Sequence, residues 1–186
     1  MKHKIIIIRG KVTAGKSTIS YELAKILPKY IFVDSWKIKE MFEPLNLKDR
    51  TPLKTISKKA MVTIIKEVMK QMQIGVIVQE TSKSFLQKYL RNELKKYNYE
   101  IYSFFLDVDL EDAIKRDIQR DKPTMDIGKG VKDNLAWKKI KAQPEKGDII
   151  IDTSSLGKKE VINFIMKTIK EKSKRHPQEN LIRRTW

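Results

Sequence analysis

The amino-acid sequence predicts an α/β fold of three layers, in which a central parallel sheet of five strands lies between two layers of helices. Two observations predict it. Short apolar segments alternate with longer amphipathic segments along the chain, as in doubly wound sheets. The first apolar segment, residues 5–8, is continuous, as expected for a central strand that is covered on both faces. The 186 residues are enough for one such domain.

A phosphate-binding loop follows this first strand. Residues 10–17 match the pattern G-x-x-x-x-G-K-[ST] between an apolar strand and a helical segment, the context that a P-loop requires. Its glycines let the backbone curl around a polyphosphate, Lys16 supplies a cation for the β- and γ-phosphates, and the Ser17 hydroxyl can bind Mg²⁺. We therefore expect the P-loop NTPase form of the three-layer fold and a bound nucleoside triphosphate. The alternative is a glycine turn that only ends a strand. The expected nucleotide contacts are Gly10, Lys11, Val12, Thr13, Ala14, Gly15, Lys16, Ser17 and Thr18.

The chain is strongly basic. It has 40 Lys and Arg against 23 Asp and Glu, which gives a formal net charge of +17. This excess favours a polyanionic partner such as nucleic acid or a nucleotide, whereas the alternative is a lysine-rich surface like that of thermophile proteins. The absence of cysteine excludes disulfides and thiolate chemistry, and the two histidines, His3 and His176, are too far apart in sequence to suggest a metal site. No apolar stretch is long enough for a signal or a membrane span, so we expect a cytoplasmic protein.

The first half of the chain places two acidic residues at strand ends. After a strand over residues 4–9, helical spacing predicts a helix over 18–27. A short strand over 30–33 then ends at Asp34, and ligands bind at the carboxyl ends of strands in open α/β sheets. Asp34 is therefore a candidate to orient or deprotonate an attacking hydroxyl, with Lys37 one turn later to bind a phosphate or the acceptor. The alternative makes Asp34 the N-cap of a helix over 35–42. In the helix over 18–27, the residues expected to face the sheet are Ile19, Leu23 and Ile26.

A second acidic residue follows the next strand. Residues 44–52 are expected to be a loop and 56–72 a helix, followed by a strand over 76–78 that ends near Glu80. A carboxylate just beyond an apolar strand can bind Mg²⁺ directly or through water, or hold the acceptor, in nucleoside triphosphate-binding enzymes. The alternative is a capping role before a helix over 85–96. The apolar face of the helix over 56–72 is expected to comprise Met61, Ile64, Ile65, Val68, Met69 and Met72.

Two arginines follow the fourth strand, which is expected over residues 100–108. Arg116 and Arg120 lie at i, i+4 in a helix predicted over 110–120, so both guanidinium groups project from one face. Arginines in this place can close over a triphosphate and stabilise the charge on the transferred phosphoryl group. The alternative is a solvated helix face with i, i+4 ion pairs. The glycine- and proline-containing stretch that follows predicts a helical lid over about 116–132.

The remaining sequence predicts a helix over 131–142, a fifth strand over 149–151 and a last helix over 158–172. The face of that last helix which packs on the sheet is expected to contain Val161, Ile162, Ile165 and Ile169. Residues 1–172 should therefore form one domain. Residues 173–186 are basic and have no sustained periodicity, so we expect a tail that becomes ordered on contact with a partner.

Together these residues resemble a family. The chain resembles the small P-loop kinases that phosphorylate hydroxyl groups, and its spacing is most similar to the kinase domain of phage-type 5′-hydroxyl polynucleotide kinases. The resemblance implies that Asp34 is the general base and that Arg120 engages the phosphates of ATP. Lys37 stands where that family has arginine, and Glu80 stands where it has aspartate. The segment 147–154 is also similar to the last strand of adenylylsulfate, gluconate and antibiotic kinases, where the following loop borders the adenine. The matching positions are Val33, Asp34, Trp36, Lys37, Glu80, Thr81, Arg116 and Arg120.

The sequence thus predicts an ATP- and Mg²⁺-dependent phosphotransferase. Lys16 and Arg120 would neutralise the γ-phosphoryl oxygens, and Ser17 with Glu80 would hold the metal. The acceptor side would comprise Asp34, Lys37, Glu80 and Thr81. The expected acceptor is a nucleic-acid 5′-hydroxyl, and the alternative is a small metabolite or nucleotide. Two alternatives to a kinase belong to other functional classes. One is an RNA-binding ATPase or switch, and the other is a nucleic-acid binder with a vestigial P-loop.

Overall fold

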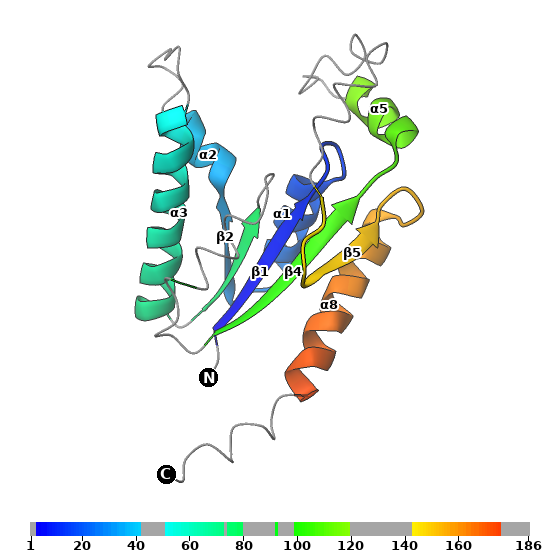
Figure 1. Cartoon of the computed structure of the whole chain (residues 1–186). Coiled ribbons are helices and arrows are strands. Elements are labelled where there is room, and N and C mark those ends of the chain that lie inside the picture. The colour runs from blue at the N-terminus through cyan, green and yellow to red at the C-terminus, as the bar shows by residue number, and fades with distance from the viewer. Residues whose placement is uncertain are drawn as a thin grey trace.

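Five strands form one sheet in which every pair of neighbours is parallel, in the order β2-β3-β1-β4-β5 (Figure 1). The computed structural model describes residues 3–41, 51–72, 74–79, 92, 99–119 and 143–175. β1 lies at the centre and pairs with both β3 and β4, so the strand before the P-loop is the middle of the sheet. The predicted five-stranded parallel sheet is confirmed. The strands are β1 (His3–Gly10), β2 (Tyr30–Asp34), β3 (Gly75–Gln79), β4 (Tyr99–Asp107) and β5 (Asp148–Asp152).

Helices cover both faces of the sheet, which completes the predicted three-layer fold (Figure 1). The predicted helices over 85–96 and 131–142 and most of the predicted lid lie outside the described residues. Within the part of the chain that is described, no helix is long and apolar enough to cross a membrane. The helices are α1 (Lys16–Ile26), α2 (Ser35–Glu40), α3 (Thr51–Gln71), α5 (Leu110–Ile118) and α8 (Lys158–Arg175).

Two helices extend further than the sequence predicted. α3 begins at Thr51, so the expected loop over 44–52 is wrong at its end. Pro52 lies in the first turn of α3, where a missing backbone N–H costs nothing because the first N–H groups of a helix have no partner within the helix. α8 continues to Arg175, so the first three residues of the predicted tail are helical. Residues 176–186 lie outside the described part of the chain.

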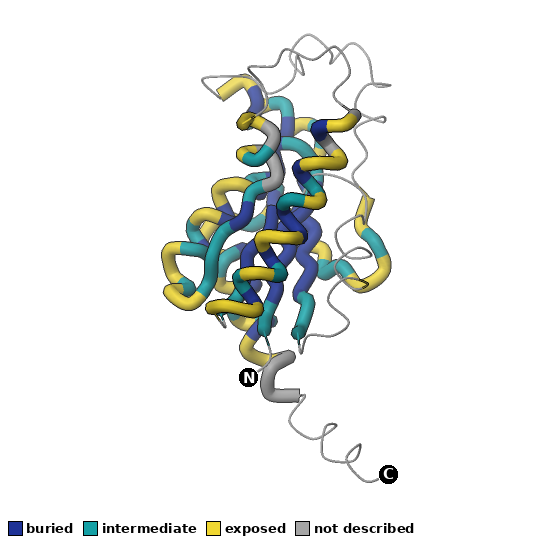
Figure 2. Tube along the Cα trace, turned by 90° about the vertical axis from the view of Figure 1, so that its left-hand side faces the viewer, coloured by how far each residue is buried: buried dark blue, intermediate teal, exposed yellow. Residues whose placement is uncertain are grey.

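The continuous apolar run of β1 supplies both hydrophobic cores. Ile6 and Ile8 face one core, which β4, α1 and α8 complete, and Ile5 and Ile7 face the other, which β3 and α3 complete. All four isoleucines are inaccessible to solvent. Figure 2 shows the buried residues running through the centre of the molecule, with exposed positions on the outer sides of the helices. The strand's two-sided burial is what its unbroken hydrophobicity predicted.

Helix periodicity predicted the buried faces with three errors. Ile26 is 49% exposed, Ile64 is 40% exposed and Met72 is 58% exposed. Ile26 has the right angular position but is the last residue of α1, and burial along its stripe ends one turn earlier, at Leu23. Ile64 lies beside the buried stripe of α3 rather than on it, and Met72 follows the last residue of that helix. The other predicted positions on these helices and on α8 are buried or half-buried.

A buried arginine ties β1 to the segment before β5. The Arg9 side chain is 1% exposed, and its Nη1 lies 3.1 Å from Asp148 Oδ2 while its Nη2 lies 3.3 Å from Glu145 Oε1. Nη2 also donates to the Gln143 carbonyl at 3.1 Å, and the guanidinium lies 5.8 Å from the centre of the Phe105 ring. A buried cation needs such partners because its desolvation costs several kcal/mol.

We expect Asp148→Leu to destabilise the fold by about 3 kcal/mol in urea unfolding, because it leaves the Arg9 charge buried and without its closest carboxylate. Glu145→Gln is the matched control and should cost much less, since the Glu145 side chain is 24% exposed. The double variant Arg9→Met/Asp148→Leu should recover part of the loss. No recovery would show that the uncompensated charge is not the cause.

Candidate nucleotide-binding site

The P-loop begins at Gly10, at the end of β1, where the backbone lies in close contact with β4. Gly10 has a φ of +142°, and a Cβ at this position would lie 2.0 Å from the Leu106 carbonyl oxygen. Only glycine fits there without moving the backbone of β4. The next residue, Lys11, donates its backbone N–H to the same Leu106 oxygen at 3.1 Å. The start of the loop is therefore fixed against the neighbouring strand.

The Lys11 side chain strengthens this attachment. Its Nζ lies 2.5 Å from Asp107 Oδ1 and donates to the Val108 carbonyl at 3.2 Å, both at the carboxyl end of β4. Lys11 was predicted as a nucleotide contact from its place in the motif. In the structure its ammonium group and its backbone N–H both bind the end of β4, and its carbonyl accepts a hydrogen bond from Lys16.

Lys16 lies where the loop becomes α1. It is 8% exposed, and its Nζ donates a hydrogen bond to the Lys11 carbonyl across the loop. Gly15 precedes the helix in the left-handed region, with a φ of +85°. The first turn of α1 contains no acidic residue, and the N–H groups of a first turn, which have no partner within the helix, attract anions. Ser17 and Thr18 are exposed in the same turn, next to the lysine.

Asp34 lies at the same edge of the sheet. It is the last residue of β2 and pairs in register with Gln79, the last residue of β3, which in turn pairs with Ile8 of β1. The sheet therefore brings Asp34 to the carboxyl edge from which the P-loop begins. α2 starts at the following residue, so this position suits both the predicted base and the alternative N-cap. Lys37 is exposed on α2, and Glu80, Thr81 and Arg120 lie outside the described residues.

Gln79 was not predicted as a site residue. Its amide side chain is 6% exposed and lies at the end of β3, between the strand of the P-loop and the strand of Asp34. The signal in the sequence was a polar residue directly after the apolar run of the third strand. That signal was assigned to the adjacent Glu80 instead.

Arg116 is held at the wall of a cavity. Its Nη1 donates to Thr153 Oγ1 at 3.2 Å and its Nη2 donates to the Thr153 carbonyl. Thr153 is itself fixed, because its backbone N–H and its hydroxyl donate to the Asp107 carbonyl at 2.9 and 2.7 Å. Lys115 and Glu111 of α5 form an i, i+4 ion pair at 2.8 Å, as the solvated-face alternative expects. Arg116 does not fit that alternative, because its guanidinium group binds Thr153.

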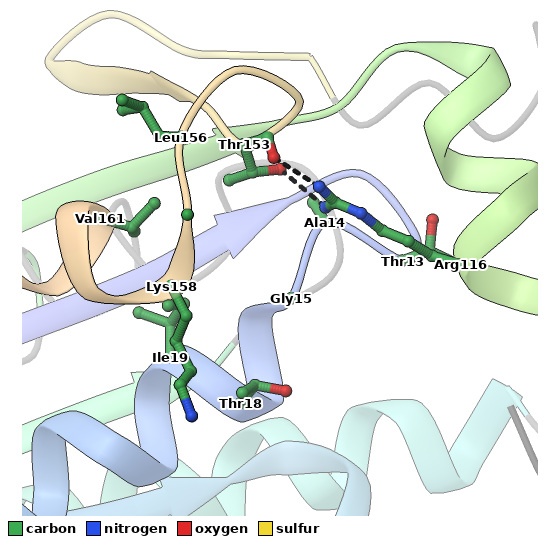
Figure 3. A pocket seen from close by; sticks show the side chains of 11 residues that line it. Thr13, Ala14, Gly15, Thr18, Ile19, Arg116, Thr153, Leu156, Lys158 and Val161 are labelled. Atoms are coloured by element: carbon green, nitrogen blue, oxygen red, sulfur yellow. Dashed lines mark hydrogen bonds between the residues drawn. The ribbon is translucent and has the colours of Figure 1, made fainter. Parts of the chain in front are cut away.

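The cavity has a volume of about 320 Å³ and opens beside the P-loop (Figure 3). Figure 3 shows Arg116 beside Thr153 and the P-loop residues Thr13 and Ala14, whereas Lys158, near the start of α8, lies beside Ile19 and Thr18 of α1. The sequence linked the segment between β5 and α8 to the site only through a resemblance, and none of its residues was predicted as a site residue. The lining residues are Thr13, Ala14, Gly15, Thr18, Ile19, Arg116, Thr153, Leu156, Gly157, Lys158 and Val161.

Two aspartates at the ends of β4 and β5 have lowered pKa values. The backbone N–H of Asp112 donates to Asp109, the N-cap of α5, and this bond is the main reason why the pKa of Asp109 lies below its ordinary value of 3.8. The backbone N–H of Ser154 and the hydroxyl of Ser155 lower the pKa of Asp152 in the same way. Among the described residues, no group of three or more acidic or histidine side chains could hold a metal ion.

Solved structures share this fold. No protein-family model and no curated protein matches the sequence. A protein from Chloroflexus aurantiacus described as a candidate kinase superposes with a TM-score of 0.68 and 14% identity, over 91% of this chain and 97% of that one. A gluconokinase from Sinorhizobium meliloti gives a TM-score of 0.60 and 13% identity, over 93% of this chain and 94% of that one. A chain of the Pnkp1/Rnl/Hen1 RNA repair complex gives 0.53 and 19%, over 74% of this chain and 46% of that one. At these identities the likeness establishes the fold, which this chain shares with P-loop kinases.

The aspartate hydrogen bonds predict a dependence of stability on pH. Because the pKa of Asp152 is lower in the folded chain than in the unfolded chain, its bonds stabilise the fold at neutral pH and lose this effect as pH falls through the folded-state pKa. The Tm difference between wild type and Asp152→Asn should therefore be present at pH 7 and shrink below about pH 4. A difference that stays constant down to about pH 3 would contradict this assignment.

Proposed function

We propose that this chain is an ATP-dependent kinase that uses Mg²⁺ and transfers the γ-phosphate to a hydroxyl group. The observation that carries the proposal is the position of Lys16. It is the first residue of α1, it reaches across the P-loop, and the loop adjoins a cavity of about 320 Å³ at the edge of the sheet where Asp34 ends β2. A nucleotide and an acceptor would thus meet at one sheet edge, which is where ligands bind in this class of fold.

The nucleotide would lie along the cavity. Its β- and γ-phosphates would take the place of the Lys11 carbonyl as partner of the Lys16 ammonium, and the first N–H groups of α1 would bind phosphate oxygens. The nucleoside would extend between Arg116 and the segment after β5. A guanidinium plane held rigidly by Thr153 offers a flat surface for a nucleobase.

The metal site is consistent with the residues present. Mg²⁺ binds oxygen ligands and is usually held by one or two protein groups together with substrate phosphates and water. The Ser17 hydroxyl is exposed in the first turn of α1, beside the proposed phosphate site, and supplies one such group. Glu80, just beyond β3, is proposed as the second. When bound, the ion would neutralise charge on the phosphates.

Transfer would proceed by attack of the acceptor hydroxyl on the γ-phosphorus. The hydroxyl proton passes to the Asp34 carboxylate, the bond from the γ-phosphorus to the β,γ-bridging oxygen breaks, and ADP leaves with the electron pair. Lys16 and Arg120 are proposed to stabilise the charge on the transferred group. Lys37, Glu80 and Thr81 are proposed to bind the acceptor, since they follow the ends of β2 and β3.

Two acceptor classes have support. A small hydroxylated metabolite is favoured because 93% of this chain superposes on 94% of the gluconokinase, so the two chains share their fold over nearly their full lengths. A nucleic-acid 5′-hydroxyl is favoured by the +17 charge and by the likeness to a chain of an RNA repair complex. The metabolite is the first candidate, because the RNA repair match covers only 46% of that longer chain.

We expect label from γ-labelled ATP to appear on an acceptor when Mg²⁺ is present. The panel should contain gluconate and other sugar acids, adenylylsulfate, nucleosides, nucleoside monophosphates, and 5′-hydroxyl RNA and DNA oligonucleotides. Label on a small molecule would support the first candidate, and label on oligonucleotide 5′ ends the second. Release of free phosphate with no labelled acceptor would instead indicate an ATPase or switch.

Asp34→Asn should lower kcat about 100-fold and leave the Kd for ATP nearly unchanged, because the carboxylate acts on the acceptor proton and not on the nucleotide. Lys16→Ala is the complementary variant and should weaken ATP binding itself. An Asp34→Asn enzyme with wild-type kcat would leave Asp34 with only a capping role.

A further inference from the structure

Lys158, the first residue of α8, lines the cavity but belongs to no motif. Its side chain is exposed, and Figure 3 shows it running from the start of α8 along Ile19 toward Thr18 in the first turn of α1. Within the described part of the chain, its ammonium group makes no hydrogen bond and no ion pair. The lysine therefore presents an uncompensated positive charge to the cavity.

The helix itself gives no reason for a lysine here. The N-terminus of a helix carries partial positive charge, so cations in the first turn are unfavourable by a few tenths of a kcal/mol. The local requirement for an acid is met two residues later, where Glu160 Oε2 accepts the backbone N–H of Gly157 at 2.8 Å. Lys158 is thus placed against the helix dipole, at a point where the neighbouring wall of the cavity contains the first turn of α1, which suits an anion.

We propose that Lys158 contacts the α-phosphate of the bound nucleotide, an inference that rests on the proposed function. If the β- and γ-phosphates bind the backbone of the P-loop and the base lies beside Arg116, the α-phosphate would bind at the first turn of α1, where Thr18 lines the same cavity. That is the residue toward which the Lys158 side chain runs. Lys16 thus serves the terminal phosphates, Arg116 the base and Lys158 the phosphate between them.

The α-phosphate explains this geometry better than the base does. Arg116 lies beside Thr153, Thr13 and Ala14, whereas the Lys158 side chain extends away from these residues toward Thr18 (Figure 3). An ammonium group on a flexible four-carbon stem acts as a point charge for phosphate and needs no fixed orientation. Recognition of a base edge would instead need a side chain that is held in one fixed orientation.

The test compares Lys158→Met with Lys159→Met. Both variants remove one exposed positive charge from the first turn of α8 and keep a long unbranched side chain, but only Lys158 lines the cavity. Affinities for ATP, ADP, AMP and adenosine are measured by competition with a fluorescent ATP analogue. Lys158→Met should weaken ATP, ADP and AMP alike, by about fivefold, and leave adenosine unchanged. Lys159→Met should change none of the four.

The other outcomes overturn the proposal. Equal losses in both variants would mean a general effect of surface charge. A loss confined to ATP and ADP would place the contact on the β-phosphate, and a loss that includes adenosine would place it on the nucleoside. Each of these results leaves the proposed kinase function intact, provided that Lys16→Ala abolishes binding. Failure of the wild-type chain to bind any of the four would reject the proposed function and this inference with it.

Discussion

The close approach of Gly10 to the Leu106 carbonyl is the constraint on which the site depends. The β1–β4 ladder continues in register to this pair, so the loop starts from a point that the sheet has already fixed. Lys11 then adds one backbone contact and two side-chain contacts at the carboxyl end of the same strand. Lys16 binds the carbonyl of that anchored residue, and its ammonium position is thereby determined by β4. The geometry of the P-loop therefore depends on β1, β4 and the loop together.

Much of the fold could be predicted because its signals are local. Four consecutive isoleucines mark a strand buried on both faces, and β2 and β3 end at the first polar residue after their apolar runs. The errors arise where the structure depends on the extent of an element or of the surface on which it packs, because the local sequence pattern does not specify either. Periodicity predicts the direction of Ile26 and Ile64 but not how far the partner surface extends. Pro52 suggested a loop because its tolerance in a first helical turn depends on where the helix begins.

The site was predictable to the extent that it is contained in one motif. The P-loop specifies its own residues, and the strand ends identify Asp34. Thr153 could not be found in this way, because its role depends on a hydrogen bond to Arg116, 37 residues earlier, that exists only once β4 and β5 pair. The i, i+4 spacing predicted the face of Arg116 but not its partner. Likewise, the net charge of the chain does not show that Lys158 of α8 lines the cavity beside the P-loop.

The ion pairs of Arg9 have a consequence for the order of events during synthesis. Arg9 is synthesised before its partners Gln143 and Glu145, which lie 134 and 136 residues further along the chain. A nascent chain on the ribosome that lacks these partners would have to bury an uncompensated guanidinium in order to complete the central strand, and this is costly. The β1–β4 half of the sheet should therefore assemble only after most of the chain has emerged, in one cooperative step of high contact order. The central strand of the sheet thus depends on partners that are synthesised much later than the strand itself.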